Sequence, residues 1–316
     1  MTIFVKEKDV HKVLTFKDTY DTLREAFLLE ESKKAVNTKR VRTSFSGSTL
    51  TYQAGALEGY LGFKTYIRGN FISLLFSKDG ELLLFAEADR LSLLRTGSLS
   101  VLAADVIKKD YSSVGIIGLG KQGLAQVEAF HKLKQGITVL GYTRSTDREA
   151  YAKRILSNLD IKLRTVQNMR DLVSQVDVVV TITTATSPFL KLEYLQKNTH
   201  VNAMGSNLPE RIELYPEVIK AAKTIVVENI EQAKEESGEL ILAEKMNMLD
   251  WNKIVGFAEY VSGKEPVRDG ISVFKSVGIG LEDVAVMKCL LNKIEAADVG
   301  TKIEVDGRWS LESVGK

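Results

Sequence analysis

The sequence has few of the residues that build disulfides and metal centres. Its 316 residues include one cysteine, Cys289, which excludes disulfides within the chain and thiolate metal clusters. The three histidines, His11, His131 and His200, are scattered along the chain, and we interpret each as a surface or packing residue. We therefore expect no metal site.

Long apolar runs and an excess of one charge are also missing. The longest apolar runs have the length of strands, which excludes a membrane span, and residues 1–9 lack the apolar core of a signal peptide. The 43 basic and 41 acidic residues nearly balance, so no nucleic-acid partner is implied. We expect a cytoplasmic protein with no membrane or nucleic-acid partner, long enough for two domains.

The most informative segment is a glycine-rich turn between a predicted strand and a predicted helix. Apolar residues 114–117 lead into Gly118, Gly120 and Gly123, and a helical pattern follows from Leu124. This order of strand, glycines and helix is typical of the dinucleotide-binding fingerprint. The free N–H groups at the start of such a helix attract phosphate, so the segment predicts nucleotide binding.

The end of the next predicted strand favours NADP over NAD. Residues 138–142 form that strand, and Thr143, Arg144 and Ser145 follow it. Proteins that bind NAD usually carry an acidic residue here for the ribose hydroxyls, whereas a guanidinium and hydroxyls bind a phosphate. The alternative is that Arg144 only opens a solvated helix. We predict that NADP(H) is preferred over NAD(H).

The pattern of strands and helices predicts two domains. From 111 to 289 they alternate, which predicts an α/β fold with a Rossmann-type, doubly wound parallel sheet. Residues 1–110 instead predict a helix, five short strands with tight turns, and a second long helix, which suggests a smaller α+β domain. A closing helix at 281–297 and a run at 301–305 could return to it, so we assign about 290–316 to this domain.

Basic residues occur where solvated charges are not expected. Arg95 lies in a predicted helix that is otherwise apolar or small, so it needs an anion, from either the protein or a substrate. Lys64 lies in a predicted strand, and Arg40 and Arg42 share one face of another. These residues could line a cleft that faces the nucleotide. An ordinary solvated sheet face explains the same spacing equally well.

These segments resemble the ornithine cyclodeaminase/μ-crystallin family, and the resemblance covers essentially the whole chain. Its members include ornithine cyclodeaminase, an archaeal alanine dehydrogenase and the NADPH-dependent ketimine reductase μ-crystallin, and they form dimers through the non-Rossmann domain. The matching segments are Arg40-Val-Arg42, Gly62-Phe-Lys64, Leu94-Arg-Thr-Gly-Ser98, Gly118-Leu-Gly-Lys-Gln122, Val201-Asn-Ala-Met-Gly-Ser206 and Phe274-Lys-Ser-Val-Gly278 with Glu282-Asp283.

The resemblance implies roles for the matching positions. Arg95 matches the arginine that clamps the substrate carboxylate, and Lys64 matches the lysine beside the substrate amine or imine. Arg40, or Arg42 if the alignment slips, matches a further carboxylate contact. With the glycine turn and the strand end described above, the predicted cofactor-binding residues are Thr96, Gly118, Gly120, Lys121, Gln122, Gly123, Thr143, Arg144, Ser145, Thr183, Met204, Gly205, Ser206, Val277 and Gly278.

The chain departs from the family at Asn207, which we predict to be a catalytic position together with Lys64. Cyclodeaminases carry an aspartate here that activates the substrate amine and water. Asparagine cannot take up a proton in the working pH range, which argues against ornithine cyclisation by the usual mechanism. Asn207 also suits a turn before Pro209.

We therefore predict an NAD(P)-dependent oxidoreductase that acts on the carbon–nitrogen bond of a small α-amino or α-imino acid, mainly in the reductive direction. One alternative is a cyclodeaminase-type lyase that converts ornithine to proline and ammonia. The other is a binding protein in which the nucleotide is only structural.

The small first domain also predicts a homodimer. Strands between residues 40 and 86 supply too few residues for an independent core and would expose an apolar face, for which Phe71, Leu74 and the run Leu82–Phe85 are candidates. Burial of this face against a second copy gives a two-fold interface. The alternative is that the closing helix from Leu281 covers the sheet within one chain.

Overall fold

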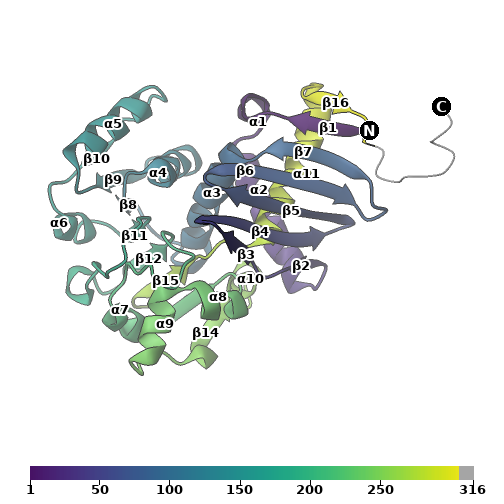
Figure 1. The fold of residues 1–316 in the computed structure, drawn as a ribbon. Helices are drawn as coiled ribbons and strands as arrows, with labels where there is room; N and C mark the ends of the chain where they lie inside the picture. The colour runs from purple at the N-terminus through teal and green to yellow at the C-terminus, as the bar shows by residue number, and fades with distance from the viewer. Residues whose placement is uncertain (306–316) are drawn as a thin grey trace, which may run out of the picture.

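The protein contains two eight-stranded sheets that lie beside each other, each with its own helices (Figure 1). The structure is a computed structural model, and it describes residues 1–305. No helix in this range has the length and apolar character needed to cross a membrane.

The second sheet is entirely parallel, in the order β10-β9-β8-β11-β12-β15-β13-β14. From β8 the chain adds β9 and β10 on one side, and it then crosses to β11 on the other side of β8. The strand order therefore reverses at β8. In parallel sheets of this kind, ligands bind at the reversal, beyond the carboxyl ends of the strands. This arrangement confirms the predicted Rossmann-type α/β fold. Its strands are β8 (Ser113–Ile117), β9 (Thr138–Tyr142), β10 (Arg164–Thr165), β11 (Val178–Thr181), β12 (His200–Ala203), β13 (Thr224–Val227), β14 (Ile254–Gly256) and β15 (Ser272–Lys275). Its helices are α4 (Lys121–Leu133), α5 (Thr146–Ser157), α6 (Met169–Val173), α7 (Pro216–Ala221), α8 (Ile230–Glu236), α9 (Gly238–Lys245) and α10 (Phe257–Val261).

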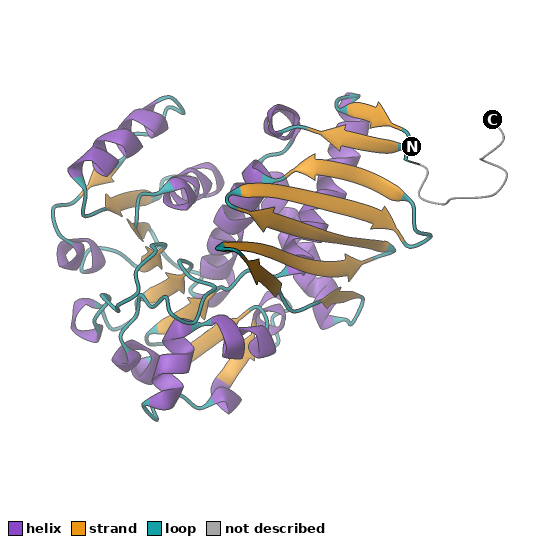
Figure 2. Ribbon diagram, in the orientation of Figure 1, coloured by secondary structure: helices purple, strands orange, loops and turns teal. Residues whose placement is uncertain are grey.

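The first sheet is antiparallel apart from the pair β1 and β7, in the order β16-β1-β7-β6-β5-β4-β2 with β3 on β4. Its helices gather behind one face, and no helix within residues 1–305 lies over the other face (Figure 2). The strands are β1 (Thr2–Val5), β2 (Ala35–Asn37), β3 (Val41–Phe45), β4 (Ser48–Leu57), β5 (Tyr60–Ile67), β6 (Asn70–Ser77), β7 (Leu82–Glu87) and β16 (Thr301–Ile303). The helices are α1 (Glu7–Val13), α2 (Phe16–Glu31), α3 (Asp89–Ile107) and α11 (Gly280–Ala297).

Helix α11 packs directly on the first sheet along β4 and β5. A Cβ atom on Gly280 would lie 2.2 Å from the carbonyl oxygen of Ala54, and one on Gly55 would lie 2.8 Å from the backbone of Leu281. Only glycine permits this approach. The predicted division placed residues 280–289 with the Rossmann domain, but they belong to α11. Residues 306–316, which were assigned to the first domain, lie outside the described range.

Of the run predicted at 301–305, residues 301–303 form β16, which pairs with β1 at the sheet edge. The sequence did not predict the strands β1, β2 and β14, nor the helices α1 and α7 to α10. These strands have three or four residues and these helices five to eight, too few for a clear periodicity.

The face of the first sheet that α11 leaves uncovered is apolar. It presents Leu61, Phe63, Leu74 and Phe85, and Leu61 is 48% exposed. Including Phe71 and Leu84 in this face was wrong, because strand alternation turns both to the opposite face. Phe71 stacks there on Tyr66, and Leu84 is fully buried against the helices.

Candidate functional site

A groove of about 860 Å³ follows the carboxyl ends of β8, β9 and β11. Of the predicted cofactor-binding residues, the groove is lined by Gly118, Gly120, Thr143, Arg144, Ser145 and Thr183. The glycine turn and the end of β9 thus lie on one cavity, although 20 residues separate them in sequence. Arg148, in the first turn of α5, lines the groove as well.

The glycine turn leaves room for a ligand backbone. Gly118 has a φ of +107°, and a Cβ atom there would lie 2.6 Å from the carbonyl oxygen of Ile182. A Cβ atom on Gly123 would lie 1.8 Å from the carbonyl oxygen of Gly118, so the turn and α4 pack closely, whereas Gly120 has open space beside it. Helix α4 has no side-chain cap, and its first N–H groups can therefore bind a phosphate.

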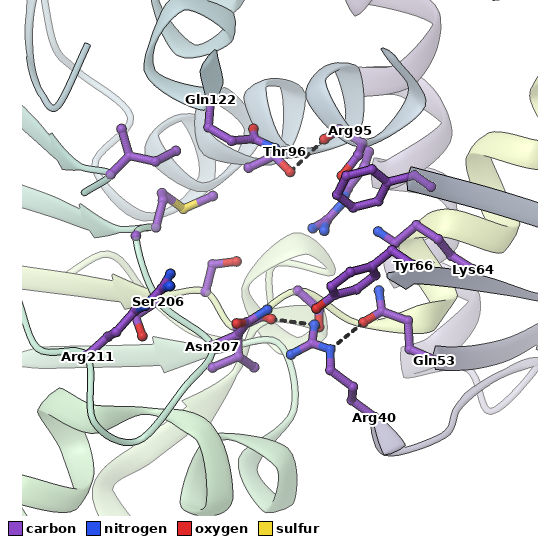
Figure 3. A pocket seen from close by; sticks show the side chains of 18 residues that line it. Arg40, Gln53, Lys64, Tyr66, Arg95, Thr96, Gln122, Ser206, Asn207 and Arg211 are labelled. Atoms are coloured by element: carbon purple, nitrogen blue, oxygen red, sulfur yellow. Dashed lines mark hydrogen bonds between the residues drawn. The ribbon is translucent and has the colours of Figure 1, made fainter. Parts of the chain in front are cut away.

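A second, smaller cavity of about 300 Å³, called here the inner pocket, lies between the first sheet, α3 and the carboxyl ends of β12 and β15 (Figure 3). Ile182 lines both cavities, so they adjoin. The predicted residues that line the inner pocket are Arg40, Lys64, Arg95, Thr96, Gln122, Met204, Gly205, Ser206, Asn207, Val277 and Gly278.

Three predicted residues line neither cavity. Lys121 forms an ion pair with Asp89, and Gly123 is buried within α4. Arg42 lies behind the inner pocket, where it donates to the Asn207 carbonyl oxygen at 2.7 Å and to Glu236 at 2.5 Å.

Lys64 is buried on β5 and donates to the Asp283 carboxylate on α11 at 2.7 Å. Burial, which disfavours the ammonium form, outweighs this carboxylate and lowers the pKa of Lys64 to about 8. Asp283 also accepts from Gln53, and its pKa is lowered because Lys64, Arg95 and these hydrogen bonds together outweigh the effect of burial. Asp283 therefore holds a lysine whose proton can move near neutral pH.

Arg95 reaches the pocket from α3, past Gly278. Its guanidinium donates to Glu282 at 2.6 Å and lies 3.6 Å from Asp283. A Cβ atom at Gly278 would lie 2.8 Å from this guanidinium, so glycine is needed beside it. Burial raises the pKa of Glu282 to about 8, despite the nearby arginine.

Arg40 is bound to the protein on several sides. It donates to Gln53 at 2.7 Å, to Glu236 at 2.5 Å, and to the carbonyl oxygens of Val277 and Gly278 at 2.8 and 2.7 Å. Arg40 and Arg42 together bind both carboxylate oxygens of Glu236, at the end of α8. These contacts fasten the Rossmann domain to the first sheet behind the inner pocket.

A buried carboxylate also fixes the opposite wall. Glu213 accepts from both the N–H and the hydroxyl of Thr183, at 2.6 and 2.7 Å, and from the N–H of Gly205 at 3.1 Å. A Cβ atom on Gly205 would lie 2.4 Å from this carboxylate. Glu213 thus ties the ends of β11 and β12 to each other.

Sequence reasoning assigned no role to Glu213, Glu236, Gln53 or Arg211, although the last two line the inner pocket. Glu236 follows Glu235 in a polar helix, so nothing in the sequence distinguishes it from a solvated acid. A signal existed for Glu282 and Asp283, because adjacent acids at the start of an apolar helix need partners. His200 is a core residue, as predicted, between Ser272 and Asn202.

The inner pocket suits one end of a nucleotide. Gln122 Oε1 is buried and accepts no hydrogen bond from the described residues, so a ligand amide can donate to it.

Residues 1–305 contain no group of three or more acidic, histidine or cysteine side chains placed to hold a metal ion.

The model of the ornithine cyclodeaminase/mu-crystallin family matches residues 2–298. The chain belongs to this family. Alanine dehydrogenase of Archaeoglobus fulgidus is 30% identical to it over 96% of this chain and 98% of the relative. This membership confirms the resemblance inferred from the sequence.

Two solved structures of family relatives are also similar. An archaeal alanine dehydrogenase, described as a dimer with bound NAD, has a TM-score of 0.88 and 27% identity over 96% of this chain and 99% of its own. Thermococcus litoralis Δ1-pyrroline-2-carboxylate reductase, in complex with NADH and L-proline, has a TM-score of 0.88 and 26% identity over 96% of this chain and all of its own.

The contacts of Glu236 generate a stability prediction. In Glu236→Gln, two guanidinium groups lose their carboxylate, and Arg40 is buried, so we expect the free energy of unfolding to fall by about 3–5 kcal/mol. The matched control is Glu235→Gln, whose partner Lys39 is exposed and screened by solvent. Urea denaturation of both variants measures the difference, and equal losses would contradict this role.

Proposed function

We propose that this protein is a nicotinamide-nucleotide-dependent oxidoreductase that reduces the carbon–nitrogen double bond of a small α-imino acid. The observation that carries the proposal is the junction of the two cavities, which places a buried lysine and a buried arginine at the inner end of a nucleotide groove. The relatives, an alanine dehydrogenase and a pyrroline-2-carboxylate reductase, support this reaction class.

The roles of the pocket residues follow from their charge and contacts. The glycine turn, Thr183 and Gln122 would hold the nucleotide, which supplies a hydride when bound. Arg95 orients the substrate carboxylate, since its guanidinium faces the pocket while Glu282 holds it from behind. Lys64 donates a proton to the imine nitrogen, for which a pKa of about 8 is suited.

Arg40 and Asn207 contribute differently from Lys64. Most donors of Arg40 are engaged with protein acceptors, so it positions the 277–278 segment and adds positive charge to the pocket. Asn207 lines the pocket as a neutral amide that can orient a substrate but cannot accept its proton.

We expect NADPH or NADH oxidation with at least one of pyrroline-2-carboxylate, piperideine-2-carboxylate, or pyruvate with ammonia or methylamine. Lys64→Ala should lower kcat/KM at least about 100-fold, because it removes the proton donor. Lys78→Ala, at an exposed turn of the same domain, is the control. Activity that is absent with every substrate, or that survives Lys64→Ala, would refute the proposal.

The pKa of Lys64 predicts a pH dependence. Its ammonium form donates the proton, so kcat/KM for reduction should fall as the pH rises through about 8. In Lys64→Arg the guanidinium keeps its proton, so the residual activity should lose this descending limb. Both pH profiles are measured with the same substrate, so any titration of the substrate affects them equally. If the wild-type and Lys64→Arg profiles coincide, the fall in kcat/KM belongs to a group other than Lys64.

A cyclodeaminase reaction is the alternative within this family. Incubation with ornithine and catalytic NAD would then yield proline with no net change in NADH absorbance. We expect none, because the pocket has Asn207 and no lining carboxylate to take up the proton. If no imino acid alters the fluorescence of a tightly bound cofactor, the nucleotide is instead only structural.

For the cofactor, we propose a preference for NADP(H). Arg144 and Arg148 both line the groove beside the hydroxyls of Thr143 and Ser145, and the Arg144 side chain has no partner within residues 1–305. A charge-assisted pair with the added phosphate is worth about 1.5–3 kcal/mol, so NADP(H) should bind at least about tenfold tighter than NAD(H).

Arg144→Asp should narrow or reverse this preference in calorimetric titrations with both cofactors. Arg154→Asp is the control, because it makes the same charge change at an exposed position of the following helix α5 that lines neither cavity. Equal affinities of the wild type for NADP(H) and NAD(H) would mean that the Arg144 side chain is solvated and does not bind the added phosphate.

We also propose a cytoplasmic homodimer joined through the uncovered face of the first sheet. Val36, Leu61, Phe63 and Phe76 line a shallow apolar groove there, and an apolar surface of this kind favours a partner. The archaeal alanine dehydrogenase described as a dimer supports the assembly. The cytoplasmic location rests on the single cysteine.

Sedimentation at micromolar concentration should give about twice the 35.1 kDa mass of one chain. Phe63→Glu should give monomers, because a charge would be buried in the interface. Leu159→Glu, an exposed site on the Rossmann domain, is the control. An active wild-type monomer would show that the proposed dimer is wrong.

A further inference from the structure

The wall of the inner pocket is strongly positive. Four cationic side chains line it, and no aspartate or glutamate does. Three of the four have a carboxylate partner behind the wall, and these pairs are Arg40 with Glu236, Lys64 with Asp283, and Arg95 with Glu282. The fourth cation is Arg211.

Arg211 follows the turn that starts at Gly205, and its backbone N–H donates to the Leu208 carbonyl oxygen at 3.0 Å. Its side chain has no hydrogen bond or ion pair with any residue in the described range 1–305, although it is only partly exposed. In Figure 3 it lies beside Ser206, across the pocket from Lys64. A guanidinium in this setting is free to pair with a ligand anion.

The phosphates of the nucleotide are not suitable partners. They belong to the groove of Gly118 and Gly120, and Arg211 does not line that groove. The groove has its own arginines, Arg144 and Arg148. The nicotinamide end of the nucleotide, which the inner pocket would receive, carries no anion. Arg211 therefore faces the part of the pocket that holds the substrate.

A substrate with one carboxylate engages Arg95 through that carboxylate and Lys64 through its imine nitrogen, but it leaves Arg211 without an anion. We propose that Arg211 binds a second carboxylate, so that the preferred substrates are imines of short dicarboxylic 2-oxo acids. The inference rests on the proposed imine reduction and specifies its substrate class. The pocket volume of about 300 Å³ is shared with the nicotinamide end of the nucleotide, so a substrate chain of four or five carbons fits better than a longer one.

The test compares two oxo acids that differ by one carboxylate. Pyruvate or oxaloacetate is mixed with ammonia, which condenses with the oxo group to the imine and releases water, and NADPH oxidation is followed. Omission of ammonia controls for reduction of the oxo acid itself. We expect the apparent kcat/KM for oxaloacetate with ammonia to exceed that for pyruvate with ammonia at least about tenfold.

Arg211→Met should reduce this ratio of kcat/KM values by about 10- to 100-fold, mainly through the KM for oxaloacetate. Arg211→Lys, which keeps the charge, should retain most of the ratio. Arg164→Met is the matched control, because Arg164 is exposed and lines neither cavity. Thermal unfolding verifies that each variant is folded.

The outcomes separate the two proposals. If no imine is reduced, the proposed function itself is wrong. If pyruvate with ammonia is reduced and the ratio does not respond to Arg211→Met, only the role of Arg211 is wrong, and Arg211 is a solvated residue. If Arg211→Met instead raises the Kd for NADPH and leaves the ratio unchanged, Arg211 binds the cofactor, and the inference is overturned.

Discussion

The ion pair between Lys64 and Asp283 is the interaction on which the site depends. A buried ammonium group without a partner would cost several kcal/mol, and Asp283 offsets this cost from the first turn of α11. Asp283 can reach Lys64 because Gly55 and Gly280 let the helix touch β4. The same turn carries Glu282, which holds Arg95, so a single helix end positions two of the four cations that line the pocket.

The two sides of the pocket are held by buried carboxylates that do not line it. Glu236 joins the first sheet to α8, and Glu213 joins the ends of β11 and β12. Each carboxylate accepts several donors, so its position is fixed from more than one direction. Because no acidic side chain lines the pocket, the surface offered to a ligand is positive, although charges nearly balance in the whole chain.

The sequence predicted the Rossmann-type sheet and the family because both depend on local patterns: apolar strands, the glycine turn and short motifs. It also placed Lys64 and Arg95 correctly on a strand and a helix. It did not predict which carboxylates pair with them, because these pairs join residues about 190 to 220 positions apart. The sequence could not tell which of Arg40 and Arg42 lines the pocket, because strand alternation puts residues two apart on the same face. In the structure β3 begins only at Val41, so Arg40 lies outside the strand and does not follow this alternation.

The return of α11 and β16 to the first sheet has a consequence for synthesis on the ribosome. Lys64 emerges 219 residues before Asp283, and β1 and its neighbour β16 are separated by a still longer stretch of chain. The strands of the Rossmann sheet all lie between residues 113 and 275, so that sheet can close while the first is still incomplete. Domains usually fold in the order in which they are made, but here the domain that begins the chain is the last to be finished.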